Sequence, residues 1–266
     1  MSQSNILIPI DFTSQSLIAL EQSYNLAKHT NSALTILYVE EDAENDKIKI
    51  DKLAREVEKK SGLPVSVIAA KGNIYKEIVR VAQKINALVI IMGIESSIKI
   101  ANIGNNAFRL LRESKCPVIT IKGKSHHNGC KSIVLPLDLT HSSREKVSKA
   151  IEFAKFFNST IHLISVRLKK DKSHEKKLIS YSQQTQKFIR EKGVPCTAKT
   201  LEGNDIAKLV LSYSHEVNAD LIMIMSKSEV SIKELFVGTT AQKIVNLSDI
   251  PILSIRPMRR KSTAKY

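Results

Sequence analysis

Two acidic residues stand at matching places, each at the end of a short apolar run and just before Ser/Thr residues. They are Asp11, in Ile8-Pro9-Ile10-Asp11-Phe12-Thr13, and Asp138, in Leu135-Pro136-Leu137-Asp138-Leu139-Thr140. A carboxylate ahead of a helix can cap its first turn and interact with the helix dipole, or it can accept hydrogen bonds from a ligand. Both interpretations stay open for the two residues.

The other candidate groups do not form a recognisable catalytic or metal site. His126, His127 and Cys130 lie close together and could bind a transition metal with His141, but their spacing matches no closed four-ligand site. The segment Met225-Ser226-Lys227-Ser228 resembles part of a synthetase ATP loop, and its partner motif is missing. No nucleophile–histidine pattern and no P-loop pattern is present. We predict no catalytic enzyme and no metal cluster.

The composition is that of an ordinary folded protein. Of the 266 residues, 42% are hydrophobic and 25% are charged, which excludes wholesale disorder. Runs such as Ala87 to Met92 are too short to span a bilayer, and no basic-then-apolar leader opens the sequence. Three cysteines at unrelated spacings do not suggest a disulfide framework. We therefore predict a cytoplasmic protein without membrane contact.

The net charge of +15 invites acidic partners. The basic residues are spread along the chain and include a basic tail at residues 259–266, whereas aromatic residues make up only 5% and Trp is absent. Nucleic-acid recognition favours charge on one face together with exposed aromatics or a reading motif. A solvated basic surface is the preferred interpretation, and nucleic acid is not an expected partner.

An internal repeat organises the chain. The segment around Asp11 recurs 127 positions later around Asp138, and Ala27-Lys28 recurs at the same offset as Ala154-Lys155. Gly72-Asn73 matches Gly203-Asn204 at an offset of 131, and Gly104 and Pro117 match Gly238 and Pro251 at 134. Length changes confined to loops are what two copies of one fold should show. The predicted units are residues 1–122 and 132–258, joined by a linker at 123–131 and followed by the tail at 259–266.

Each copy alternates predicted strands and helices. In the first copy, strands are expected at Asn5 to Ile10, Ala33 to Val39, Val65 to Ala70, Ala87 to Met92 and Pro117 to Ile121. Helices are expected after Thr13 or Ser14, near Asp46 to Lys60, from Asn73, and through Leu110 and Leu111. This alternation with doubly apolar strands indicates a five-stranded parallel sheet covered on both faces, a Rossmann-like α/β fold. Ligands of such sheets bind at the carboxyl ends of the strands, where the strand order reverses.

At these residues the sequence resembles the universal stress protein family. Its first strand runs into a Pro-x-Asp turn, the position of Asp11 and Asp138, and a Pro-Val-containing strand closes the domain, as in Cys116-Pro117-Val118-Ile119. The resemblance implies two tandem domains of the adenine nucleotide alpha hydrolase-like type, related by pseudo-twofold packing through their final strands. It also allows for a homodimer.

The nucleotide-binding members of that family carry a glycine-rich loop after strand four, which leads into a Gly-Ser or Gly-Thr helix start. Glycines let the backbone approach a phosphate, and the helix N-terminus offers free N–H donors. The matching residues of the two copies are Asp11, Gly93, Gly104 and Asn105, and Asp138, Gly238, Thr239 and Thr240. They are the expected sites for ATP or another adenine nucleotide.

Both loops depart from the family pattern. The first copy has Ser96 in place of the second glycine and a loop two residues short, and the second copy has Ser226 and Glu229 in place of both glycines. Gly104 and Gly238 can equally be loop-to-helix turns without a ligand. Two functions therefore stay open, a stress-response module that binds adenine nucleotide at one or both copies, and a non-nucleotide scaffold that binds unidentified protein partners.

Overall fold

The computed structural model describes residues 3–39, 43–94, 109–111, 113–123, 129–139, 142–167, 175–226 and 240–256. In the first half the strands are β1 (Ser4–Ile10), β2 (Ser32–Val39), β3 (Val65–Ala70), β4 (Val89–Gly93) and β5 (Val118–Ile121). The helices are α1 (Ser14–Thr30), α2 (Ala43–Ser61) and α3 (Ile74–Lys84), and residues 109–111 are also helical.

The second half repeats this order. Its strands are β6 (Ser132–Leu137), β7 (Thr160–Arg167), β8 (Cys196–Glu202), β9 (Leu221–Met225) and β10 (Ile252–Ile255). Its helices are α5 (Ser142–Phe157), α6 (Glu175–Glu191), α7 (Ile206–Glu216) and α8 (Thr240–Leu247). Left-handed asparagines mark the same helix ends in both halves, Asn31 with Asn158 and Asn86 with Asn218. The predicted duplication is confirmed by these matched turns.

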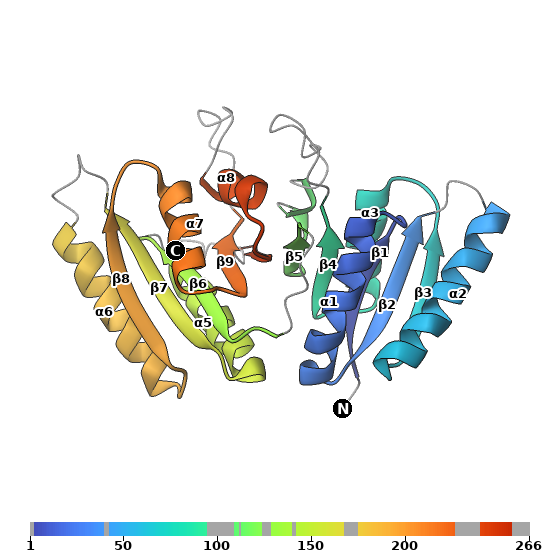
Figure 1. Cartoon of the computed structure of the whole chain (residues 1–266), viewed down its shortest axis with the longest axis horizontal. Coiled ribbons are helices and arrows are strands. Elements are labelled where there is room, and N and C mark those ends of the chain that lie inside the picture. Colours follow the sequence, from blue (N-terminus) through green and yellow to red (C-terminus); the bar gives the residue numbers. More distant parts are fainter. Residues whose placement is uncertain are drawn as a thin grey trace, which may run out of the picture.

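The ten strands form one sheet in the order β3-β2-β1-β4-β5-β10-β9-β6-β7-β8. Strand neighbours within each half are parallel, and β5 pairs with β10 in the antiparallel direction. The order of one half is therefore the reverse of the other, as a pseudo-twofold axis between the two final strands requires. Figure 1 shows the first half in blue to green and the second half in yellow to red, on either side of this seam. The predicted fold class is confirmed.

Helices cover both faces of the sheet. Alternate residues of β1 point to opposite faces, so that Ile6 and Ile8 join one core cluster and Leu7 joins the other. The first cluster contains side chains of α1, α2, α5 and α6, and the second contains side chains of α3, α7 and α8. Each half is thus a three-layer unit, and the first cluster runs without interruption through both halves.

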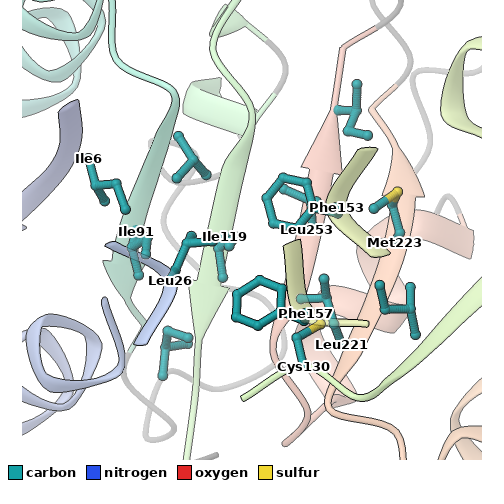
Figure 2. Packing of buried hydrophobic residues seen from close by; sticks show 14 of the residues in the cluster. Ile6, Leu26, Ile91, Ile119, Cys130, Phe153, Phe157, Leu221, Met223 and Leu253 are labelled. Carbon is teal, nitrogen blue, oxygen red and sulfur yellow. The ribbon is translucent and has the colours of Figure 1, made fainter. Parts of the chain in front are cut away.

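The seam between the halves is apolar. Phe153 and Phe157 of α5 lie among side chains of both halves, with Leu26 and Ile119 on one side and Leu221 on the other (Figure 2). The ring of Phe157 also packs on His29 of α1, with 4.6 Å between ring centroids. Burial of this much apolar surface holds the halves together as one body.

Two basic side chains cross the seam reciprocally. Lys122, after β5, donates to the Asn246 carbonyl at the end of α8 (2.5 Å), and Arg256, after β10, donates to the Glu113 carbonyl (2.7 Å). Lys122 and Arg256 are separated by the same 134 positions as the two final strands. Cations favour the carbonyl end of a helix, so each half caps a helix of the other.

Candidate functional site

The strand order of the first half reverses between β1 and β4, and Asp11 follows β1 at this point. The backbone N–H and the Oγ1 hydroxyl of Thr13 donate to Asp11 Oδ1, at 3.0 and 2.6 Å. Thr13 in turn is the N-cap of α1, because its hydroxyl accepts from Ser16 N at 3.3 Å. Asp11 therefore does not cap α1 itself but holds the residue that does.

The carboxylate of Asp11 is kept charged. Burial raises the pKa of Asp11, but hydrogen bonds from the side chains of Thr13 and Ser16 and from nearby backbone N–H groups outweigh this effect and lower the pKa below its usual value. Asp11 is nevertheless exposed. An ionised, exposed carboxylate at the strand-order reversal can accept hydrogen bonds from a ligand's hydroxyl or amino groups.

Two half-buried aromatic residues lie near Asp11, its chain neighbour Phe12 and Tyr75 of α3. Phe12 has a left-handed backbone with φ of 60°, a conformation that costs a non-glycine residue about 1–3 kcal/mol. Its ring lies 5.7 Å from the ring of Tyr38, near the end of β2. Burial and the charge of Asp11 raise the pKa of Tyr75 in α3, so Tyr75 lies within electrostatic reach of the carboxylate. Strained backbone of this kind is concentrated at ligand sites.

Gly93 has a packing role at this site. A Cβ atom on Gly93 would lie 2.3 Å from the backbone carbonyl atoms of Gln15 and 2.6 Å from Ser16 N, which only glycine avoids. The Gln15 side chain then exchanges two hydrogen bonds, each of 3.1 Å, with the backbone of Gly123 after β5. The first turn of α1 is thereby held against the ends of β4 and β5. We call Asp11, Phe12, Tyr38, Tyr75 and Gly93 the first candidate site.

The second half differs at the corresponding position. Asp138 and the exposed Leu139 follow β6, and Lys146 of α5 is buried beneath them with 5% of its surface exposed. The ammonium group of Lys146 donates to the Pro136 carbonyl. Burial lowers the pKa of Lys146 from 10.5 to about 8, although the charge of Asp138 acts in the opposite direction. The equivalent residue of the first half, 127 positions earlier, is Ala19.

Strand pairing corrects the alignment of the two copies after strand four. Ile6 pairs with Val89, and Ile133 pairs with Leu221, so β4 matches β9 at an offset of 132. Gly93 therefore matches Met225. The sequence pattern had predicted Ser226 at this place, and that prediction is wrong. Ser226 instead matches Ile94, and each donates its backbone N–H across to the final strand of its half. Asp138, Leu139, Lys146 and Met225 form the second candidate site.

The structure describes only part of the two expected phosphate loops. Gly104, Asn105, Gly238 and Thr239 lie outside the described residues, as do Ser96, Glu229, His126, His127, His141 and the 259–266 tail. Thr240 is the first residue of α8. Asp11 and Gly93 do come together, since each contacts the first turn of α1 or its cap. Sequence reasoning missed Gln15, Tyr75 and Lys146, which carry no motif.

Neither a metal site nor a membrane span is found in the part of the chain that the structure describes. No three His, Cys, Asp or Glu side chains there come together as metal ligands would. None of the helices in that part combines the length and the hydropathy needed to cross a bilayer. Cys130, which lies close to His126 and His127 in the sequence, is buried, and burial raises the pKa of its thiol to about 12.

Comparison with known proteins gives the family. None of the curated proteins matches the chain. A universal stress protein from Archaeoglobus fulgidus DSM 4304 has a similar structure, with a TM-score of 0.77 at 19% identity over 95% of this chain and 96% of that one. A putative universal stress protein from Pseudomonas aeruginosa UCBPP-PA14 has a TM-score of 0.73 at 20% identity over 96% and 94%. The model of the universal stress protein family matches residues 3–122 and again 129–256, so the chain belongs to that family as a tandem member.

Proposed function

We propose that this protein is a stress-response binding module that takes an adenine nucleotide at the first candidate site. The observation that carries the proposal is Asp11, an ionised and exposed carboxylate at the strand-order reversal, fixed in place by two hydrogen bonds from Thr13. Its charge suits it to accept hydrogen bonds from ribose hydroxyls or the adenine amino group. The half-buried rings of Phe12 and Tyr75 supply flat apolar surface beside it, and the buried ring of Tyr38 packs behind Phe12.

The second candidate site is a poorer place for the same ligand. The ammonium group of Lys146 already interacts with Asp138, and Met225 adds a side chain where Gly93 has none. Both changes remove features that the first candidate site offers: a carboxylate that has no cationic partner among the residues the structure describes, and a close approach of strand and helix. We propose one nucleotide per chain.

Isothermal titration with ATP and with AMP tests the proposal. We expect one binding event per chain, weakened by about tenfold or more in Asp11→Ala, because one charge-assisted hydrogen bond contributes about 1.5–3 kcal/mol. The matched change Asp138→Ala should leave the affinity within about twofold. A flat titration of the unaltered chain with both nucleotides sinks the proposal, and loss of binding in Asp138→Ala alone would assign the ligand to the other half.

Protein association is the second role that the sequence left open, and the structure narrows how it can occur. β5 lies between β4 and β10, so the strand through which the halves pair is not available to a second copy. A homodimer would need another surface. The cytoplasmic location, the absence of catalysis and the domain limits at 1–122 and 132–258 stay proposals.

A further inference from the structure

A groove separates α3 from the helical residues 109–111 and has a volume of about 280 Å³. Tyr75 and Val79 of α3 and Leu110 of the facing segment supply its apolar lining. Lys76 lies on one wall and Arg109 on the other. We call these five residues the α3 groove. Its volume is just below the roughly 300–1,000 Å³ that is typical of small-molecule sites.

The cations of the groove retain free donors. Arg109 donates through Nε to Glu113 at 2.9 Å, and its two Nη groups have no acceptor in the described part of the chain. The ammonium group of Lys76 likewise has no ion pair there. Arg80, which also lines the groove, differs because it donates to Glu77 Oε2 through two nitrogens, at 2.8 and 2.6 Å. Among the described residues, two cationic groups on opposite walls are therefore left to meet a ligand.

The chemistry of the lining defines the ligand. The paired Nη groups of an arginine match the two oxygens of a carboxylate or phosphate, and an ammonium group adds a second charge contact. The Tyr75 ring and the Val79 and Leu110 side chains can cover an apolar body. We propose that the α3 groove binds a small organic anion, with one carboxylate or phosphate group on an aromatic or aliphatic body.

This site is separate from the nucleotide proposal. The groove opens between two helices, whereas Asp11 lies at the end of β1, and only Tyr75 belongs to both. The groove stands on its own lining, so it holds whether or not ATP binds. A ligand that contacts Tyr75 in the groove would also change the surroundings of the first candidate site, because Tyr75 belongs to both.

Nuclear magnetic resonance titration of the full chain tests the groove, with benzoate and phenyl phosphate as probes. We expect saturable shifts of the Tyr75, Val79 and Leu110 amide signals, and the tighter of the two probes identifies the preferred anion. Benzyl alcohol, which has the ring without the charge, should bind at least about tenfold more weakly. Lys76→Gln and Arg109→Gln should each weaken the anion by roughly three- to tenfold.

Arg55→Gln is the matched control, since it removes the same charge from an exposed position on α2. Its affinity for the probes should equal that of the unaltered chain. Shifts that are equally weakened in Arg55→Gln would indicate general attraction to a basic surface and overturn the proposal. Absence of saturable shifts with both anions, or equal binding of benzyl alcohol, would overturn it as well. Repeating the titration in Asp11→Ala separates the groove from the nucleotide site, because groove binding should persist.

Discussion

The two halves have kept the same framework and have diverged at their candidate sites. The framework agrees in detail, since the Ser114 and Ser248 hydroxyls each donate to the carbonyl two residues on, beside the final strands. At the candidate sites, however, Gly93 is matched by Met225 and Ala19 by Lys146. After duplication the positions that fix strand order were retained, whereas those that shape the carboxyl ends of the strands changed. Similarity of fold thus does not make the two sites equivalent.

The contrast has a common physical cause, the thickness of the layer between the sheet and the helix above it. In the first half Gly93 and Ala19 are small, and α1 begins with its backbone against the end of β4. In the second half two long side chains occupy that layer. A residue with a Cβ atom cannot make the approach that Gly93 makes, so α5 must begin farther from β9 than α1 does from β4.

Exchanging the glycine tests this contrast with the largest expected effect. Gly93→Met should lower the free energy of unfolding by about 3 kcal/mol, because its Cβ would collide with backbone atoms that cannot move independently of α1. Urea unfolding measures the change. At the matching position of the second half, Met225→Ala removes a half-buried side chain and should lower the free energy of unfolding by about 1 kcal/mol. Equal costs at the two positions would show that the halves pack alike and that the comparison is wrong.

Lys146 gives the contrast a pH dependence. Below pH 8 its charge is buried in the folded protein, which costs stability, and in the unfolded chain the same amine stays protonated up to its ordinary pKa of 10.5. The unfolded state therefore binds more protons between pH 8 and 10.5, and stability from this group rises with pH across that window by about 3 kcal/mol at most. Lys146→Met should remove this rise and stabilise the protein at pH 7 by about 2 kcal/mol.

The control for this measurement lies one turn away. Lys149 is half-buried on the same helix, with 40% of its side chain exposed, and pairs with Glu152 at 2.8 Å, so Lys149→Met should change stability by less than about 0.5 kcal/mol at any pH. Denaturant unfolding at pH 7, 8, 9 and 10 compares the variants. A Lys146→Met protein whose stability follows that of the unaltered chain at every pH would mean that the amine is hydrated in the folded state.

The sequence was sufficient for the fold and insufficient for this difference. The apolar runs predicted the strands, Val65–Ala70 among them to the residue, and of the two predicted caps, Thr13 and Ser14, the structure has Thr13. The family's loop pattern aligned Gly93 with Ser226, because Ser226 and Glu229 have the spacing of its two glycines. That alignment implies an offset of 133 between Gly93 and Ser226. The structure shows only one extra residue before α7, whose N-cap is Asp205 rather than Asn204, so the offset rises from 131 to 132. A single inserted loop residue leaves no mark on hydrophobic periodicity, and only strand pairing reveals it.

Lys146 and Tyr75 show a second limit. A lysine in an amphipathic helix is ordinarily exposed, so nothing in the sequence distinguishes Lys146 from Lys149 three positions on. Tyr75 approaches Asp11 only because α3 and β1 lie next to each other in space, far apart in the chain. Contacts that depend on how helices settle against the sheet cannot be read from local patterns.

The smallest expected effect concerns the seam, where the halves should behave alike. Lys122→Met and Arg256→Met each remove one charged donor from the last carbonyls of a helix in the other half, and each should cost about 0.5–1 kcal/mol. The two costs should be equal within error and additive in the double variant, because the donors cap different helices. Urea unfolding of the two single variants and the double variant measures this. Unequal costs would show that the two halves differ at the seam as well as at their candidate sites. Strong coupling in the double variant would show that the two caps act as one unit.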